Sequence, residues 1–179
     1  MKNILLAIAV SICFLSNAQT FTLKSNELGG QATKKQAYNS FGCTGENISP
    51  QLYWENPPIG TKSFAVSIYD ENAPTGSGWW HWLIFDLDKE VRELKSGAGD
   101  IKKQGAPLNS IQSKNDLGLY GYQGPCPGEG EPYHKYTVTV NALKVAKLGL
   151  DSNATPAITG YYLQQNLIEK ASLVFYMKR

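Results

Sequence analysis

The chain has 179 residues, and its 17 lysine and arginine side chains against 15 aspartate and glutamate side chains give a net charge of +2. So balanced a charge argues against a nucleic-acid-binding face or a polybasic membrane surface. Hydrophobic residues make up 42% of the chain, and a chain of this size can bury a full core without staples.

Residues 1–18 have the features of a secretory signal peptide. Lys2 precedes an apolar run at Ile4–Leu15. The small residues Ser16 and Ala18 then occupy the −3 and −1 positions before the predicted cleavage site. The apolar run is too short for a membrane span, which takes about 20 residues, so a retained N-terminal anchor is the less favoured alternative. We expect cleavage after Ala18, export to the periplasm or the medium, and one domain at residues 19–179 without an integral membrane segment.

Short runs of β-branched and aromatic residues predict strands in the rest of the chain. They lie at Phe21–Lys24, Phe64–Tyr69, Trp82–Leu87, Tyr136–Leu143 and Leu173–Tyr176. Loops rich in Gly, Pro, Asn and Ser are expected at Gly42–Pro58, Ala73–Gly78, Gly97–Lys114 and Asp116–Pro132. These loops are longer than the usual connection of about 4–6 residues, and long ordered loops tend to carry function.

One helix is expected near the C-terminus. Thr155 is a good N-cap with Pro156 at the first helical position, and apolar residues then keep helical spacing to Lys170, at Ile158, Tyr161, Tyr162, Leu163, Leu167 and Ile168. Because strands outnumber helices, the predicted fold class is mainly β, as a sandwich or a β-rich α+β domain, with this helix plus short helical turns.

Cys43 and Cys126 are the two cysteines beyond the signal peptide. An even pair in an exported protein favours a disulfide, with two buried thiols as the alternative. A free Cys126 near His134 would be a conceivable nucleophile, but a disulfide conflicts with that chemistry.

Polar side chains lie at three predicted strand ends, next to aromatic residues. Asp70 ends one strand, His81 lies between two tryptophans at the start of the next, and His134 precedes Tyr136 at the start of a third. Alternate residues of a strand share a face, so His134 and Tyr136 should point the same way. Such a set suits a small anion or polar ligand, although each residue alone is also compatible with a turn cap or a packed core residue.

The sequence does not contain the usual motifs of a zinc site, a serine hydrolase or a phosphate-binding loop. A zinc site from His81 and His134 with Cys126 or Asp70 does not have the usual ligand spacing, and the chain contains neither a G-x-S-x-G elbow nor a phosphate-binding glycine motif. We therefore predict no catalytic residue, no metal site and no cofactor, with hydrolase activity as the least favoured alternative.

The stretches NISPQLYWENPPIGTKSFAVSIYDENAPTGSGWWHWLIFDL (Asn47–Leu87) and NDLGLYGYQGPCPGEGEPYHKYTVTVNAL (Asn115–Leu143) resemble the phosphatidylethanolamine-binding protein family. They are most similar to its bacterial Raf-kinase-inhibitor-like branch, the YbhB/YbcL group. The resemblance implies two antiparallel sheets in Greek-key order, and a small pocket for phosphoryl anions at one end of them. It places ligand-binding residues at Asp70, Asn72, Pro74, His81, Gly124, Pro125, Cys126, His134 and Tyr136, to which we add Trp80 as an aromatic wall.

The chain departs from the family pattern at several positions. Glu71 and Asn72 replace proline and aspartate, Lys135 replaces arginine, and Gly128 replaces a usual proline. Asn72 removes a negative charge beside the expected pocket, which should favour anions over ligand ammonium groups.

The predicted function is therefore that of an exported protein that binds phosphate or another phosphoryl anion. His81 and His134 would donate to the oxyanion, Tyr136 would add a hydroxyl donor, and Asp70 would orient an imidazole. The alternative is an interaction module, similar to kinase inhibitors, that acts on extracytoplasmic or host protein partners. The resemblance also implies a homodimer.

Overall fold

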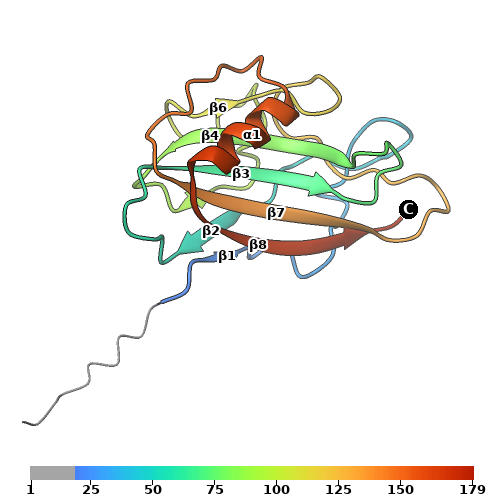
Figure 1. Ribbon diagram of the computed structural model, residues 1–179. Helices are drawn as coiled ribbons and strands as arrows, with labels where there is room; N and C mark the ends of the chain where they lie inside the picture. Colours follow the sequence, from blue (N-terminus) through green and yellow to red (C-terminus); the bar gives the residue numbers. More distant parts are fainter. Residues whose placement is uncertain (1–18) are drawn as a thin grey trace, which may run out of the picture.

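The computed structural model describes residues 19–179, which form two β-sheets and one helix (Figure 1). The expected signal peptide lies outside the described residues. The elements are β1 (Thr22–Lys24), β2 (Leu52–Glu55), β3 (Ser63–Asp70), β4 (Trp79–Asp88), β5 (Glu93–Leu94), β6 (Ile111–Gln112), β7 (His134–Leu143), α1 (Pro156–Asn166) and β8 (Leu167–Met177). Within this part of the chain, no helix has the length and apolar character needed to cross a membrane.

Both sheets are antiparallel. The larger has the strand order β6-β4-β3-β7-β8, and the smaller has the order β1-β2-β5. Strand β3 is central and pairs with both β4 and β7 from end to end. Its near-continuous apolar sequence reflects burial on both faces of the sheet. The prediction of a mainly β fold with two antiparallel sheets is confirmed.

The main core lies between the two sheets and is formed by alternate residues of their strands, among them Leu52, Trp54, Phe64, Val66, Ile68, Trp82, Val138 and Val140. The opposite face of the large sheet is covered by α1, which crosses it in Figure 1. There Leu163 joins Ala65 and Phe85 in a second buried cluster. The strands β3 and β4 are thus buried on both faces, which gives the strand ends that carry the site a rigid base.

The helix begins where the sequence predicts, with the Thr155 side chain accepting a hydrogen bond from the Ile158 amide. It ends at Asn166 rather than at Lys170. The next residue, Leu167, is extended and pairs with Leu143, so the expected last helical turn is the start of β8. A ladder along the whole of β7 outweighs the local preference for helix.

The apolar residues of α1 do not gather on one face. Ile158 and Tyr161 are 41% and 59% exposed, and the buried residues are Pro156, Thr159 and Leu163. Because apolar residues occur all round this helix, their spacing does not define the buried face.

The five predicted strands are present with shifted ends, and three short strands were missed. Two of these, β2 and β6, lie in segments that were expected to be loops, Gly42–Pro58 and Gly97–Lys114. Hydrogen-bonded turns connect the strands of residues 19–179, and one of them, in which the Ala37 amide donates to the Thr33 carbonyl oxygen, is a single helical turn.

Candidate functional site

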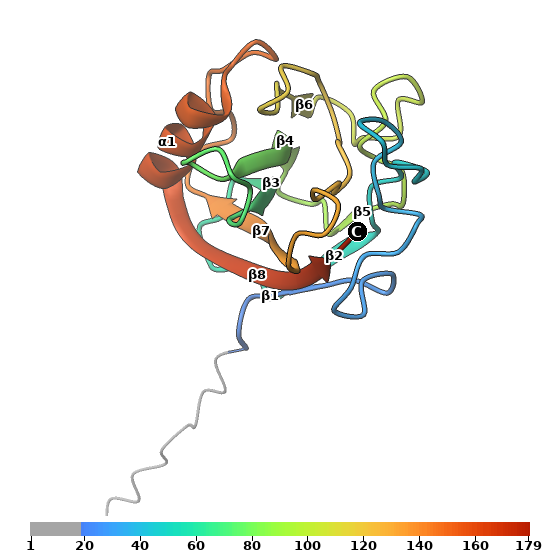
Figure 2. The ribbon, with the colours of Figure 1, turned by 90° about the vertical axis from the view of Figure 1, so that its right-hand side faces the viewer.

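Antiparallel pairing brings three strand ends together at one edge of the large sheet. Asp70 ends β3 and lies opposite both Trp79 of β4 and Tyr136 of β7. Directly paired residues point to the same face of a sheet, and His134, two residues before Tyr136, shares that face. This edge is at the right of Figure 1, and Figure 2 views the molecule from that side.

His81 joins this group because β4 contains a bulge. Tyr69 pairs with Trp80 and Ile68 pairs with Trp82, so His81 is an extra residue with no partner of its own on β3. A bulge changes the direction in which a side chain points. His81 is buried and lines the same pocket as Asp70.

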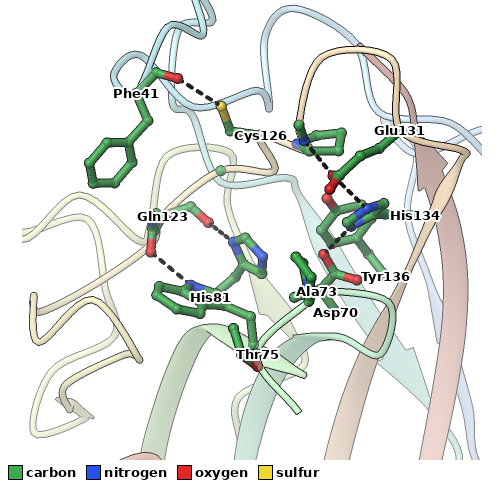
Figure 3. Close-up of a pocket in the computed structure, with 15 residues that line it drawn as sticks. Phe41, Asp70, Ala73, Thr75, His81, Gln123, Cys126, Glu131, His134 and Tyr136 are labelled. Atoms are coloured by element: carbon green, nitrogen blue, oxygen red, sulfur yellow. Dashed lines mark hydrogen bonds and ion pairs between the residues drawn. The ribbon is translucent and has the colours of Figure 1, made fainter. Parts of the chain in front are cut away.

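The pocket at this edge has a volume of about 310 Å³ (Figure 3), which suits a small ligand. Strand ends contribute part of its lining, and the loops around Phe41, after β3 and before β7 contribute the rest. The lining residues are Phe41, Asp70, Ala73, Pro74, Thr75, Trp79, His81, Gln123, Gly124, Cys126, Pro127, Gly128, Glu131, His134 and Tyr136.

His134 lies between two carboxylates. Its Nδ1 is 2.7 Å from Asp70 Oδ2, and its Nε2 is 3.1 Å from Glu131 Oε2. Asp70 also accepts a hydrogen bond from the Asn72 amide, and Glu131 accepts one from the Gly128 amide at 2.6 Å. The imidazole is therefore oriented by Asp70, as the sequence predicted, and its outer nitrogen faces a carboxylate that the sequence did not reveal.

Both ring nitrogens of His134 face oxygens that only accept while the carboxylates are ionised. A charged imidazole donates from both nitrogens, whereas a neutral one donates from a single nitrogen. With the ring charged, Asp70, Glu131 and His134 together carry a net charge of −1. In that charged form neither nitrogen has a lone pair for a metal ion, and no three His, Cys, Asp or Glu side chains among residues 19–179 are grouped as metal ligands.

His81 has different hydrogen-bond partners from His134. Its Nδ1 is 2.9 Å from the Gln123 carbonyl oxygen, and burial lowers the pKa of the ring from 6.5 to about 4. A carbonyl only accepts, so Nδ1 carries the proton and Nε2 of the neutral ring carries a lone pair. The prediction that His81 donates to an anion is thus incompatible with the neutral ring, and the ring remains neutral between pH 6 and pH 8.

Tyr136 stands between the two histidines. Its ring stacks on Phe175 with centroids 5.0 Å apart and meets the edge of His81 at 5.3 Å. Burial, followed by the nearby charge and hydrogen bond of Asp70, raises the pKa of its hydroxyl. The phenol therefore stays protonated beside Asp70.

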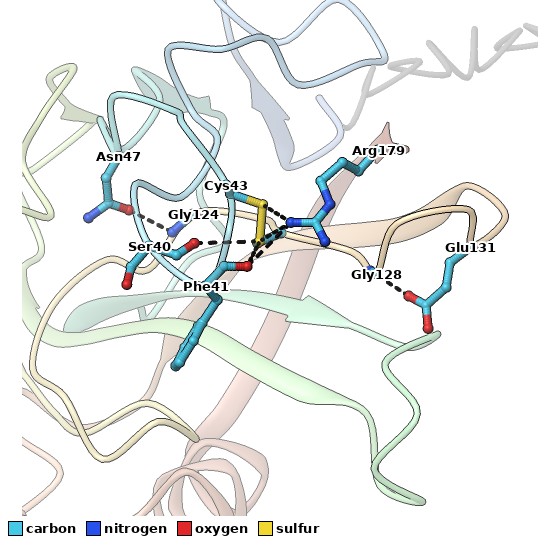
Figure 4. The surroundings of a disulfide bond; sticks show 9 residues. Ser40, Phe41, Cys43, Asn47, Gly124, Gly128, Glu131 and Arg179 are labelled. Carbon is cyan, nitrogen blue, oxygen red and sulfur yellow. Dashed lines mark hydrogen bonds between the residues drawn. A yellow bond between two sulfur atoms is a disulfide. The ribbon is translucent and has the colours of Figure 1, made fainter.

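The outer wall of the pocket is a loop that backbone contacts and a disulfide hold in place (Figure 4). Gly124 donates to the Asn47 side chain at 2.7 Å, and a Cβ at this glycine would lie 2.2 Å from the Gln36 carbonyl oxygen. Cys43 and Cys126 form a disulfide, which confirms the predicted pairing. A bonded Cys126 has no thiol for nucleophilic chemistry.

The last residue of the chain reinforces this wall. The Arg179 guanidinium donates to the Phe41 carbonyl oxygen at 3.3 Å and lies 3.4 Å from Cys43 Sγ. The Phe41 side chain lines the pocket. Segments from both ends of the chain and from its middle thus meet at the disulfide.

Seven of the ten predicted ligand-binding residues line the pocket, and they are Asp70, Pro74, His81, Gly124, Cys126, His134 and Tyr136. Three do not. Trp80 packs against Tyr69 on the other face, with ring centroids 4.7 Å apart. The Asn72 side chain accepts a hydrogen bond from the Lys135 amide and so holds the loop after β3 to the start of β7. Pro125 lies outside the lining, and its carbonyl oxygen accepts from the Tyr38 amide.

Several lining residues were missed by the sequence analysis. Trp79 takes the place assigned to Trp80, and its indole donates to the Gln123 side chain at 3.2 Å. Two-residue periodicity from His81 contained this signal, because Trp79 and not Trp80 is two residues away. Glu131 carried a weaker signal, its position three residues before His134.

Comparisons with known proteins agree with this fold. A family model described as phosphatidylethanolamine-binding protein matches residues 26–178. YbcL of Escherichia coli strain K12 is 41% identical over 176 residues, which cover 97% of this chain and 96% of YbcL. YbhB of the same organism is 39% identical over 153 residues, which cover 84% of this chain and 96% of YbhB.

Solved structures give the same result. The crystal structure of E. coli YbcL, described as a new member of the mammalian PEBP family, matches with a TM-score of 0.87 and 42% identity, over 89% of this chain and 98% of that chain. CT736 from Chlamydia trachomatis, a putative homologue, matches with a TM-score of 0.73 and 26% identity, over 92% and 99% of the two chains.

The two-sheet fold with a pocket at its strand ends, together with these matches, defines the class: the chain belongs to the phosphatidylethanolamine-binding protein family. Within that family it is similar to the bacterial proteins YbcL and YbhB, which confirms the resemblance seen in the sequence.

Proposed function

We propose that the protein binds small phosphoryl anions in the pocket at the ends of β3, β4 and β7. One observation carries this proposal. The Glu131 carboxylate, itself an oxyanion, lies in the pocket against the Gly128 amide at 2.6 Å and His134 Nε2 at 3.1 Å. The same two donors suit a phosphoryl oxygen, because carboxylate and phosphate oxygens accept the same charge-assisted hydrogen bonds.

In this proposal the ligand takes the place of Glu131. Asp70 remains on His134 Nδ1 at 2.7 Å and keeps Nε2 aimed into the pocket. When Glu131 turns out, a charged His134 and Asp70 balance each other. A ligand with one negative charge then replaces the negative charge of the displaced Glu131 carboxylate. The exchange therefore leaves the net charge of the pocket unchanged.

The family supports phosphoryl chemistry in general. Its description names phosphatidylethanolamine, a lipid whose phosphoryl group is a diester. The pocket of about 310 Å³ has the size of a head group and not of a lipid with its acyl chains. We therefore propose phosphate or a small phosphoryl compound as the ligand.

We also propose that the protein acts outside the cytoplasm. The Cys43–Cys126 disulfide supports this location, because disulfides persist mainly in oxidising compartments. The signal-like composition of residues 1–18 points the same way.

Calorimetric titration of the purified protein with inorganic phosphate and O-phosphorylethanolamine tests the proposed ligand. We expect the wild type to bind and His134→Ala to lose about tenfold or more in affinity, because a hydrogen bond to a charged group contributes about 1.5–3 kcal/mol. Glu129→Gln is the control, since Glu129 is exposed and lies on the same loop outside the pocket.

Thermal unfolding of each variant verifies that it is folded. A wild type that binds neither compound, or a folded His134→Ala variant that binds as tightly as the wild type, contradicts the proposed function.

A further inference from the structure

We propose that His81 makes the pocket select phosphoryl groups that carry a proton, and reject sulfate and phosphodiesters. This inference rests on the proposed anion site and names the class of ligand that the site takes. It assigns His81 the role of a hydrogen-bond acceptor within an anion pocket.

The contact between His81 and Gln123 carries the inference. His81 Nδ1 lies 2.9 Å from the Gln123 backbone carbonyl oxygen, and both residues are buried. A carbonyl oxygen has no proton to give, so the proton of this hydrogen bond belongs to Nδ1. In a neutral imidazole the other nitrogen, Nε2, is then an acceptor.

Among the described residues, the hydrogen bond of the His81 ring runs through Nδ1, and no partner donates to Nε2. Two other polar groups of the pocket have partners of their own, since His134 Nδ1 bonds Asp70 and the Trp79 indole donates to the Gln123 side chain. His81 itself lines the pocket. The lone pair of Nε2 is therefore available to the ligand. Because a buried acceptor without a partner costs free energy, this position favours a ligand group that donates a hydrogen bond.

The other side of the pocket has the opposite character. Once Glu131 is displaced, His134 Nε2 and the Gly128 amide both offer donors. The complete site then presents donors on one side and one acceptor on the other. A phosphoryl group with an ionised oxygen and a P–OH on the same phosphorus satisfies both sides.

Sulfate has the same tetrahedral shape but no proton at neutral pH, so one of its charged oxygens would face the His81 lone pair. A phosphodiester, the linkage in an intact phospholipid, also has no P–OH. Inorganic phosphate keeps at least one proton at neutral pH. A phosphomonoester loses its last proton with a pKa of about 6 and therefore still carries it in part at that pH.

Calorimetry with matched ligands tests the inference at about pH 6. Phosphate is compared with sulfate, and O-phosphorylethanolamine with glycerophosphorylethanolamine, which has the same head group as a diester. We expect each protonated ligand to bind about 100-fold more tightly than its partner, because a site built to bond a hydroxyl strongly rejects an analogue that lacks it. Ethanolamine alone should not bind.

Two variants locate the effect. In His81→Gln the side-chain amide offers a donor as well as an acceptor, so the preference for phosphate over sulfate should fall to about tenfold or less. Glu129→Gln should keep the wild-type preference. Nitrogen-15 NMR of the free wild-type protein adds a measurement that needs no variant, and it should show a protonated Nδ1 and an unprotonated Nε2 at His81.

Equal binding of phosphate and sulfate, or of the monoester and the diester, would overturn the inference while the anion pocket stands. A proton on Nε2 in place of Nδ1 would overturn it without reference to any ligand. Binding of ethanolamine alone would show that the acceptor takes an ammonium group, which also overturns it. If no phosphoryl ligand binds, the proposed function fails and the inference fails with it.

Discussion

Replacing Glu131 should make the pocket bind phosphate more tightly. The carboxylate holds the Gly128 amide and His134 Nε2, the two donors that the ligand needs. A hydrogen bond to a charged group contributes about 1.5–3 kcal/mol when buried. The Glu131 side chain is 35% exposed, so solvent screening and the cost of ordering the loop reduce this value.

We take about 1.5 kcal/mol for the two contacts together, which corresponds to about a tenfold excess of the occupied state over the open state. The apparent affinity falls in proportion to the open fraction. Glu131→Ala should therefore lower the phosphate Kd about tenfold. Glu131→Gln should lower it less, because a neutral amide still accepts a hydrogen bond from Gly128 but binds His134 more weakly.

Calorimetric titration with phosphate at about pH 7 measures these changes. Glu129→Gln is the matched control, because it removes the same charge from an exposed position of the same loop. An equal gain in Glu129→Gln would mean that only the long-range charge matters. Unchanged or weaker binding in Glu131→Ala would refute the argument that this carboxylate competes with the ligand.

Two further predictions concern stability and the wall of the pocket. Replacing both Cys43 and Cys126 by serine should lower the free energy of unfolding by about 4 kcal/mol on the loop-entropy model and weaken phosphate binding as Phe41 loses its support; unchanged urea denaturation and unchanged titration would contradict this. Between pH 6.5 and about 4, the unfolded state binds a proton that folded His81 does not, so the free energy of unfolding should fall by about 3 kcal/mol as the pH falls through that window. Urea denaturation at several pH values should show this slope in the wild type and lose it in His81→Phe, and equal slopes in the two proteins would be evidence against it.

The sequence predicted the site residues whose positions follow from local rules. Asp70, His134 and Tyr136 lie at strand ends, and two-residue periodicity places the last two on one face. Counting cysteines was enough for the disulfide. These features need only the strand pattern and the even number of thiols, both of which are visible in the printed chain.

The remaining features depend on the partner strand or on a loop. The bulge at His81 is defined by its pairing with β3, so simple alternation puts Trp82 and Trp79 on opposite faces, whereas the pairing puts them on the same face. Glu131 reaches His134 through a loop that follows no periodic pattern. The end of α1 at Asn166 depends on the ladder between β7 and β8, which no local propensity contains.

The two halves of the pocket differ in how they are attached to the protein. Asp70 and His134 belong to neighbouring strands in the middle of the large sheet, where opening requires much of the fold to separate. Glu131 belongs to the short segment that leads into β7 and is held by two polar contacts. Recognition chemistry is thus fixed by the central strands of the sheet, while the rate at which a ligand enters is set by how often one side chain turns out of the pocket.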